Sequence, residues 1–222
     1  MAAAAVAAVL LLGSSSGSGP TPAETKAAEA INLRASDLPG FSIAPHQAAS
    51  PQDHQFDTDF NRCIGPQASN SGGVDLPSPT FIAANGAQVD EVSSDVSFAT
   101  SSSTVTRALA LIHAGTLGGC LVQALDGATF TTSGGVPLTI GNANAISMQT
   151  RAPGSVGSFG VRTSMTISGP AAGLPASMDA LGFAVGRKEI TLTAFTIGQP
   201  FPTGAEQRLY TRLLTRTLAQ QP

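Results

Sequence analysis

Alternating apolar residues in the C-terminal half of the chain constrain its fold more than any other feature. From residue 159 to residue 167 every second residue is apolar or Thr, and the alternation returns at residues 181–185. Side chains two residues apart lie on one face of a β-strand, so the pattern predicts strands with one face toward a core. Glycine-containing turns separate the runs, as in an antiparallel meander. The expected strands cover residues 136–149, 156–168, 179–186 and 190–198, the last apolar on both faces and therefore central.

Apolar residues at helical spacing predict helices around these strands. The clearest helix covers residues 204–219, and a shorter one suits residues 24–34. A third follows Ser101, and Gly115 with the glycines at 118 and 119 should end it near Cys120. With a further strand at residues 89–99, this order predicts an α+β fold: an antiparallel sheet of about five strands with helices packed on one face.

Residues 42–88 show little periodicity. They are rich in Pro, Gly, Ser and Asn, which predicts a loop-rich segment. So long an irregular stretch is uncommon in a compact domain unless something holds it in place, and Cys63 lies within it.

The N-terminus is typical of an exported protein. Residues 2–12 are uninterrupted apolar residues (AAAAVAAVLLL), which matches a signal-peptide hydrophobic region and is too short to span a bilayer. We therefore expect a signal-peptide-like leader at residues 1–12, a flexible Ser/Gly/Pro tether at 13–24 and a single α+β domain at 25–222. An Ala-rich tail is the alternative, because no basic residue precedes Lys26. Lipidation is in doubt, since Ser14 stands where a lipoprotein box has its Cys.

The two cysteines, Cys63 and Cys120, are the only ones in the chain. In an oxidising compartment an even pair is most simply one disulfide, and the alternative is two buried thiols. They do not form a CxxC motif, so neither a redox motif nor a zinc site is indicated.

No motif indicates catalysis, a cofactor or a metal. A GxSxG pattern occurs at residues 13–17, but it lies in the tether and lacks the flanking strand and helix of a nucleophile elbow. The acidic residues between Asp53 and Asp59, with His54, form either a solvated acidic turn or a weak metal site. We expect no catalytic residue, no cofactor and no metal.

Arg208, Arg212 and Arg216 lie four residues apart and form a basic ridge on the last helix. Such a ridge can contact anionic lipid head groups or cell-wall polymers, and the alternative is a solubilising face. Nucleic acid is excluded as a partner, because only 11% of residues are charged and the net charge is −3.

A resemblance to a known family rests on three features. The first is the leader with its tether, and the second is the sequence SDLPGF at residues 36–41. The third is Cys63 with a possible partner in Cys120, which follows a VxSDVxF strand at residues 92–98 and a helix. Over residues 30–219 the chain resembles the extracytoplasmic sensor-like domains of actinobacteria, which include the outer domain of mycobacterial sensor-type serine/threonine kinases. The resemblance implies an antiparallel sheet flanked by helices, with a cleft for an unidentified ligand. The chain has one disulfide where the kinase form carries two, has no kinase domain, and matches no motif that would carry over a functional residue.

Three functions follow from these expectations. The leading hypothesis is a non-enzymatic extracytoplasmic ligand-binding or sensor-like domain, secreted or attached to the cell envelope, whose partner is an unknown small ligand or envelope component. A structural or interaction protein of the envelope is the second, and a hydrolase the third. The oligomeric state is left open.

Overall fold

The computed structural model describes residues 19–45, 51–65, 73–113, 115–131, 137–169 and 173–220. The predicted leader, the first half of the tether and the GxSxG pattern therefore lie outside the described residues.

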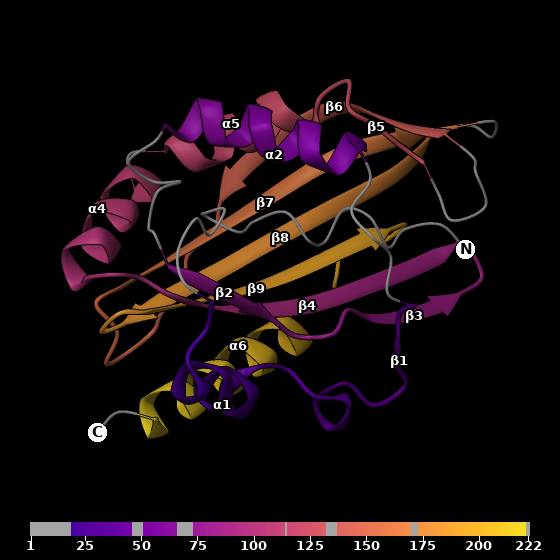
Figure 1. Ribbon diagram of the computed structural model, residues 1–222. Coiled ribbons are helices and arrows are strands. Elements are labelled where there is room, and N and C mark those ends of the chain that lie inside the picture. The colour runs from indigo at the N-terminus through magenta and orange to yellow at the C-terminus, as the bar shows by residue number, and fades with distance from the viewer. Residues whose placement is uncertain are drawn as a thin grey trace.

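One antiparallel sheet forms the centre of the molecule (Figure 1). Over the described residues it has nine strands: eight run in the order β1-β3-β4-β9-β8-β7-β6-β5, and the ninth, β2, pairs with β4. The α+β class is confirmed, but the sheet has more strands than the five expected, because several are too short for an alternating pattern to show. The strands are β1 Ser42–Ile43, β2 Val74–Pro77, β3 Phe81–Asn85, β4 Gln88–Phe98, β5 Thr129–Thr131, β6 Pro137–Ser147, β7 Gly157–Ser168, β8 Leu174–Val185 and β9 Lys188–Ile197.

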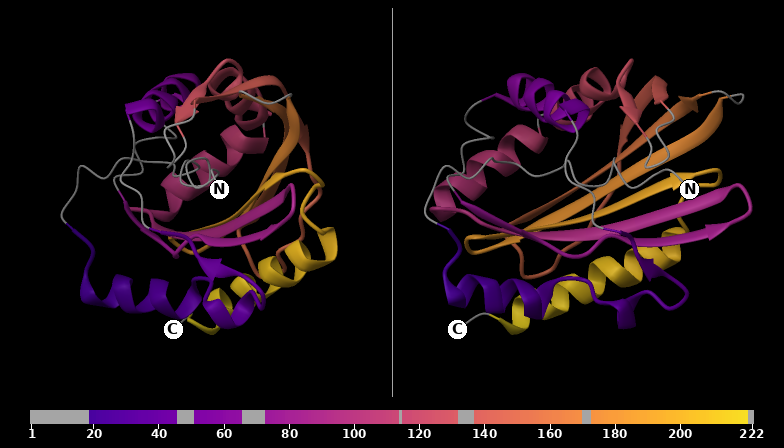
Figure 2. Two further views of the ribbon diagram at one scale, coloured as in Figure 1. Left: turned by 90° about the vertical axis from the view of Figure 1, so that its right-hand side faces the viewer. Right: turned by 45° about the vertical axis from the view of Figure 1, so that its right-hand side comes forward.

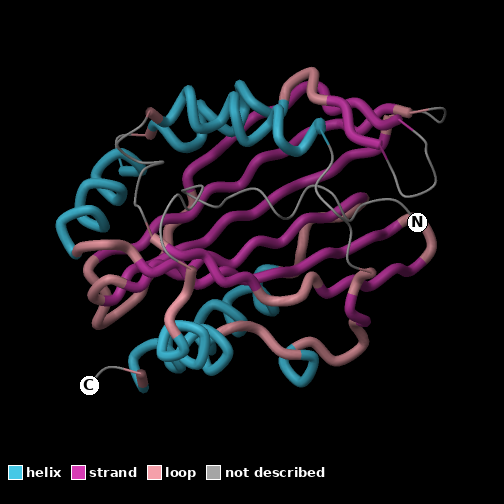
Figure 3. The backbone as a smooth tube through the Cα atoms, viewed as in Figure 1, coloured by secondary structure: helices cyan, strands magenta, loops and turns pink. Residues whose placement is uncertain are grey.

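Helices cover both faces of this sheet, where the sequence predicted one (Figures 1 and 2). The reason is that the central strands β8 and β9 are apolar on both faces, and each apolar face needs a cover. We name the faces after the helices that pack on them, and Figure 3 shows the two groups of helices on either side of the strands. The α6 face packs against α1 Pro22–Ile31 and α6 Thr203–Ala219, and the α5 face against α2 Pro51–Ile64, α4 Ser102–His113 and α5 Thr116–Leu125.

In the described residues, the arrangement gives one core on the α6 face, one on the α5 face under α2 and α5, and a smaller cluster between α4 and the sheet. On the α6 face, Leu181 and Leu192 pack with the buried side of α6, and the rings of Phe183 and Tyr210 meet edge to face at 5.3 Å. On the α5 face, Met178 and Phe195 belong to the core under α2 and α5. Among the described residues no single helix is long and apolar enough to cross a membrane; only α4 and α5 together reach that length, as a pair bent by 72°.

Helix α1 begins earlier than expected. Thr21 caps it, because its Oγ1 accepts a hydrogen bond from the Glu24 backbone N–H at 3.2 Å while Glu24 Oε2 accepts one from the Thr21 N–H at 2.9 Å. The helix therefore starts at Pro22, inside the residues assigned to the tether.

Residues 51–64 form a helix, α2, which corrects the expectation that residues 42–88 are loop-rich throughout. Phe56, Phe60 and Ile64 are spaced four apart and buried, and the two phenylalanine rings stack at 6.0 Å. The polar residues between them make this apolar stripe hard to recognise in the sequence. The acidic residues from Asp53 to Asp59 consequently lie on a helix and not in a turn.

A disulfide joins Cys63 of α2 to Cys120 of α5, with a Cα–Cα distance of 5.4 Å. Cys120 lies within α5 and not at a helix end. The helical conformation is interrupted earlier, at Gly115, whose φ of +81° favours glycine. The bond ties α2 to a helix that itself packs on β6 and β7.

Replacing Cys63 by Ser should destabilise the protein. The bridged residues are 57 apart, and the chain-entropy model gives such a loop about 4 kcal/mol as an upper value. Under non-reducing conditions we expect a lower melting temperature, and proteolysis should attack α2 first while the strands stay protected. Equal melting temperatures for the variant and the oxidised protein would show that the bond does not stabilise the fold.

Candidate functional site

Four buried or half-buried carboxyl groups lie on the α5 face of the sheet, near its β2 and β4 side. Odd-numbered residues of β4 and β9 point to this face, as the packing of Phe195 and Ile197 with α5 shows. None of the four takes part in an ion pair found in the described part of the chain. We call them the acidic face: Asp75, Glu91, Asp95 and Glu189.

Three of these carboxyls gather around Ser97. Strand pairing places Asp75 of β2 and Glu189 of β9 directly beside Ser97, one on each side. The Ser97 hydroxyl lies 2.5 Å from Asp75 Oδ1 and 3.0 Å from Asp95 Oδ2. A hydroxyl has a single proton to donate, so it satisfies one carboxylate at a time. Asp95 Oδ1 and Glu189 Oε1 are buried with no hydrogen-bond partner at all.

Burial raises the pKa of the carboxyls around Ser97. The pKa of Asp95 is about 7 because the group is removed from water and because the charge of Asp75 lies close by. The pKa of Glu189 is also about 7, for the same two reasons in the same order. Burial likewise raises the pKa of Asp75, against the opposing effect of the Ser97 hydrogen bond. Asp95 and Glu189 therefore change their protonation state near neutral pH.

Glu91 is the most deeply buried member of the acidic face. Its exposed fraction is 0%, neither carboxyl oxygen has a partner, and burial raises its pKa to about 8. Asp95 follows four residues later on the same face, about 13 Å away along an extended strand. Glu91 pairs across the sheet with Phe195, which pairs with Met178 of β8.

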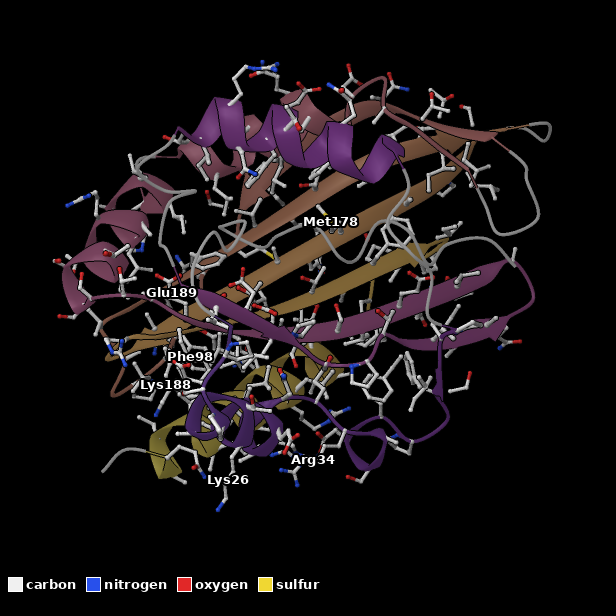
Figure 4. All side chains as sticks on the ribbon, in the orientation of Figure 1. Lys26, Arg34, Phe98, Met178, Lys188 and Glu189 are labelled. Carbon is white, nitrogen blue, oxygen red and sulfur yellow. A yellow bond between two sulfur atoms is a disulfide. The ribbon has the colours of Figure 1, made fainter. Side chains whose placement is uncertain are left out.

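Short side chains lie between Glu91 and Asp95. The row of paired residues there consists of Ser93, Thr193 and Ala180, on β4, β9 and β8. On the next row toward Asp95 the β8 residue is Gly182. These residues have shorter side chains than Phe195 and Met178, and we call this part of the α5 face its floor. Figure 4 shows Glu189 toward the α4 end of the strands and Met178 nearer their middle.

A small cavity of about 20 Å³ lies between α4 and this floor. Its polar side consists of Ser97, Glu189 and Thr191, and its apolar side includes Leu109 and Ile112 of α4. Phe159 of β7 also lines it, with its ring directly over Gly182: a Cβ added there would lie 2.2 Å from Phe159 Cε1. The volume suffices for one group the size of a water molecule.

The basic ridge of α6 is partly engaged within the fold. Arg216 binds Asp37 through both guanidinium nitrogens at 2.8 Å, and Arg212 Nη1 binds it at 2.7 Å. Burial raises the pKa of Asp37, but the hydrogen bonds from Arg216 and Arg212 outweigh it and leave the pKa below its ordinary value. These two arginines thus tie α6 to the SDLPGF segment, while Arg208 stays exposed. Contact of the ridge with an anionic surface stays a prediction.

The other residues singled out from the sequence form no site among the described residues. Asp59 accepts hydrogen bonds from Arg62 and Gln55 on the surface of α2, and the side chains at positions 53, 54 and 57 lie outside the described part. His113 Nε2 lies 2.9 Å from the Ser158 backbone oxygen, and His46 is not among the described residues. Within the described ranges, no group of three or more His, Cys, Asp or Glu side chains could hold a metal ion.

Sequence reasoning missed the acidic face. In strand 89–99 polar residues stand between the apolar ones, and such alternation usually indicates a face toward solvent. The signal that they are covered lay one strand away, in residues 190–198, which are apolar on both faces and pair with β4 along its length. A strand beside a strand that is buried on both faces is itself often covered on both faces, so acidic residues on either face of it can be buried.

Comparison with known proteins places the chain in no family. No protein-family model matches it, and no curated protein matches it. Among solved structures it is similar to the extracellular domain of PknH from Mycobacterium tuberculosis, with a TM-score of 0.47 and 11% sequence identity over 91% of this chain and 100% of that one. A likeness at this level identifies neither a family nor a function for the chain.

Proposed function

We propose that this protein is a non-enzymatic, extracytoplasmic ligand-binding or sensor-like domain whose small ligand lies on the acidic face of the sheet. The single observation that carries the proposal is Glu91, fully buried with both carboxyl oxygens unpaired. Burying a polar group without a partner costs about 1–3 kcal/mol, and more for a charged one, so folded proteins nearly always pair such groups. A group that breaks this rule, on the same face as Asp95 with its own unpaired oxygen, supports a site whose missing partner is a ligand.

The disulfide supports a location outside the cytoplasm. Such bonds form and persist in oxidising compartments, and the Cys63–Cys120 bond fixes a helix that has few other attachments to the sheet. The apolar leader expected at residues 1–12 agrees with export.

The lining of the cavity favours binding over hydrolysis. A hydrolase that used Asp95 and Glu189 as acid and base would need to hold the reacting bond between them. The cavity beside Glu189 measures about 20 Å³, and Asp95 does not line it, so it places no reacting bond between the two carboxyls. A small polar tip of a ligand fits it.

Native mass spectrometry of the protein purified from its own host tests the proposal. We expect a bound small molecule whose mass disappears on denaturation. Replacing Ser93 by Leu should abolish the bound mass, because Ser93 is half-buried on the floor between Glu91 and Asp95, and Leu would place a larger, apolar side chain there.

The matched control is Ser164→Leu. Ser164 is an exposed residue of β7 that points to the opposite face of the sheet, so its replacement should leave the bound mass in place. Retention of the ligand by the Ser93 variant would contradict the proposed location. The absence of any bound species from the wild-type protein under all growth conditions would contradict the function itself.

A further inference from the structure

We infer that the cavity between α4 and the acidic face binds the terminal ammonium group of a primary alkylamine, such as a free polyamine or the side chain of a peptide lysine. This inference rests on the proposed function and names the chemical class of its ligand. It is carried by the shape and lining of the cavity, which includes Glu189 with its buried, unpaired Oε1. Asp95 pairs across the strands with the lining residue Thr191 and has a second buried, unpaired oxygen.

The lining of the cavity divides into an acidic end and an apolar end. Glu189, Ser97 and Thr191 supply oxygen atoms on one side, and Leu109, Ile112 and Phe159 supply hydrocarbon on the other. An alkylammonium ion has the same division, with a head group that donates three hydrogen bonds and a stem that is apolar. The head group is about the size of a water molecule, for which a cavity of about 20 Å³ has room.

The hydrogen-bonding groups around the cavity have acceptors to spare. Glu189 Oε1 and Asp95 Oδ1 are buried without partners, and the Ser97 proton is shared between Asp75 and Asp95. Strand pairing places Thr191 beside Asp95 and Ser97 beside Glu189, so these oxygens lie on one small area of the sheet. A donor with several protons and a positive charge is the group that this set lacks.

The charges near the site favour a cation. The carboxyls of Asp75, Asp95 and Glu189 are joined by no described arginine or lysine: Arg187 donates to the Ala99 carbonyl, and Lys188 to that of Gln220. On α4, the helix above the cavity, the charged or titratable residues Arg107 and His113 are exposed. No arrangement of described residues suits a metal ion, and the apolar walls favour an organic cation.

Calorimetric titration of the full-length chain with butylamine tests the inference. We expect binding near neutral pH, accompanied by release of protons, because a bound ammonium ion lowers the pKa of Glu189 and Asp95 from about 7. Titration in two buffers of different ionisation enthalpy measures this release. 1-Butanol, which has the same shape and no charge, should bind at least tenfold more weakly.

Glu189→Gln keeps the shape of the site and removes its charge, and it should weaken butylamine binding about tenfold or more and reduce the proton release. The control is Glu29→Gln, at an exposed glutamate on α1 at the other face of the sheet, which should change neither value. A lysine-containing peptide with blocked ends and a polyamine, compared in the same assay, distinguish the two sources of the ammonium group.

Equal affinity for butylamine and 1-butanol, or full amine binding by Glu189→Gln, would overturn the inference. If the protein from its host carries a ligand in the Ser93-dependent site but binds no alkylamine, the amine assignment is wrong and the proposed function stands. If neither is bound, both are wrong.

Discussion

Replacing Glu91 by Gln should stabilise the protein at alkaline pH by up to about 5 kcal/mol and leave its stability unchanged near pH 4. The pKa of Glu91 is about 8 in the folded protein because the carboxyl is buried, against an ordinary value of 4.5. In the unfolded chain the carboxyl loses its proton at a lower pH than in the folded protein. The protonated group's contribution to the free energy of unfolding is therefore fully present below pH 4.5, and it is lost as pH rises to about 8. At about 1.4 kcal/mol per pH unit this difference sets the upper limit given above. Glutamine has nearly the same shape and carries no proton to lose.

Denaturant unfolding of both proteins from pH 4 to pH 9 measures this effect. The two stability curves should coincide at low pH and diverge steadily through neutrality, with the variant above the wild type. Glu29→Gln, at an exposed position, should follow the wild-type curve throughout. Parallel curves for the wild type and the Glu91 variant would mean that Glu91 is solvated or paired in the folded state.

Replacing Asp179 by Ala should destabilise the protein by about 3 kcal/mol or more. Asp179 is 1% exposed on the α6 face, where it accepts hydrogen bonds from Arg162 Nε at 2.6 Å and Nη2 at 2.5 Å. Removing one partner of a buried ion pair leaves the other charge without compensation. Glu206 of α6 lies beside the pair, and burial, followed by the charge of Asp179, raises its pKa to about 8. Without Asp179, Glu206 should ionise more readily and partly replace it, so the double variant with Glu206→Gln should lose more stability.

The matched control for this pair is on the protein surface. Asp59 and Arg62 of α2 form an ion pair at 2.8 Å whose side chains are 36% and 72% exposed. Exposed pairs contribute between 0 and about 1 kcal/mol, so Asp59→Ala should have little effect. Chemical denaturation of the two variants compares them directly. Equal losses for Asp179→Ala and Asp59→Ala would show that the Arg162–Asp179 pair adds nothing beyond a surface contact.

The sequence predicts the long strands and the last helix well, because these elements carry a periodic apolar pattern over ten or more residues. β7, β9 and α6 lie within a few residues of their expected bounds. The short strands and α2 are not predicted, for physical reasons. β1 and β3 have too few residues for an alternating pattern to be recognised. In α2 only every fourth residue, at Phe56, Phe60 and Ile64, belongs to the apolar stripe. A periodic apolar pattern indicates that one side of a helix or strand is buried. The short strands and α2 are instead stabilised by contacts with residues far away in the sequence.

The candidate site could not be predicted from local pattern. Asp95 and Glu91 read as solvent-facing residues of a strand, because a sequence does not say that a second layer covers that face. Ser97, Asp75 and Glu189 come from three strands, and their meeting depends on the pairing of β4 with both β2 and β9. The disulfide, in contrast, is the simplest interpretation of two cysteines in an exported chain, since Cys63 has one potential partner, and the structure favours it over the alternative of two buried thiols.

The proposed function requires that the α5 face hold unpaired buried carboxyls that a ligand could satisfy. The most direct test is a ¹³C NMR titration of the Glu91 carboxyl carbon against pH in the ligand-free protein. The predicted result is a titration midpoint near pH 8, the pKa that burial gives this group. Addition of a ligand that reaches Glu91 should then move the midpoint. A midpoint near the ordinary value of 4.5 would mean that the carboxyl is in contact with water, and the acidic face would lose the feature that marks it as a binding site.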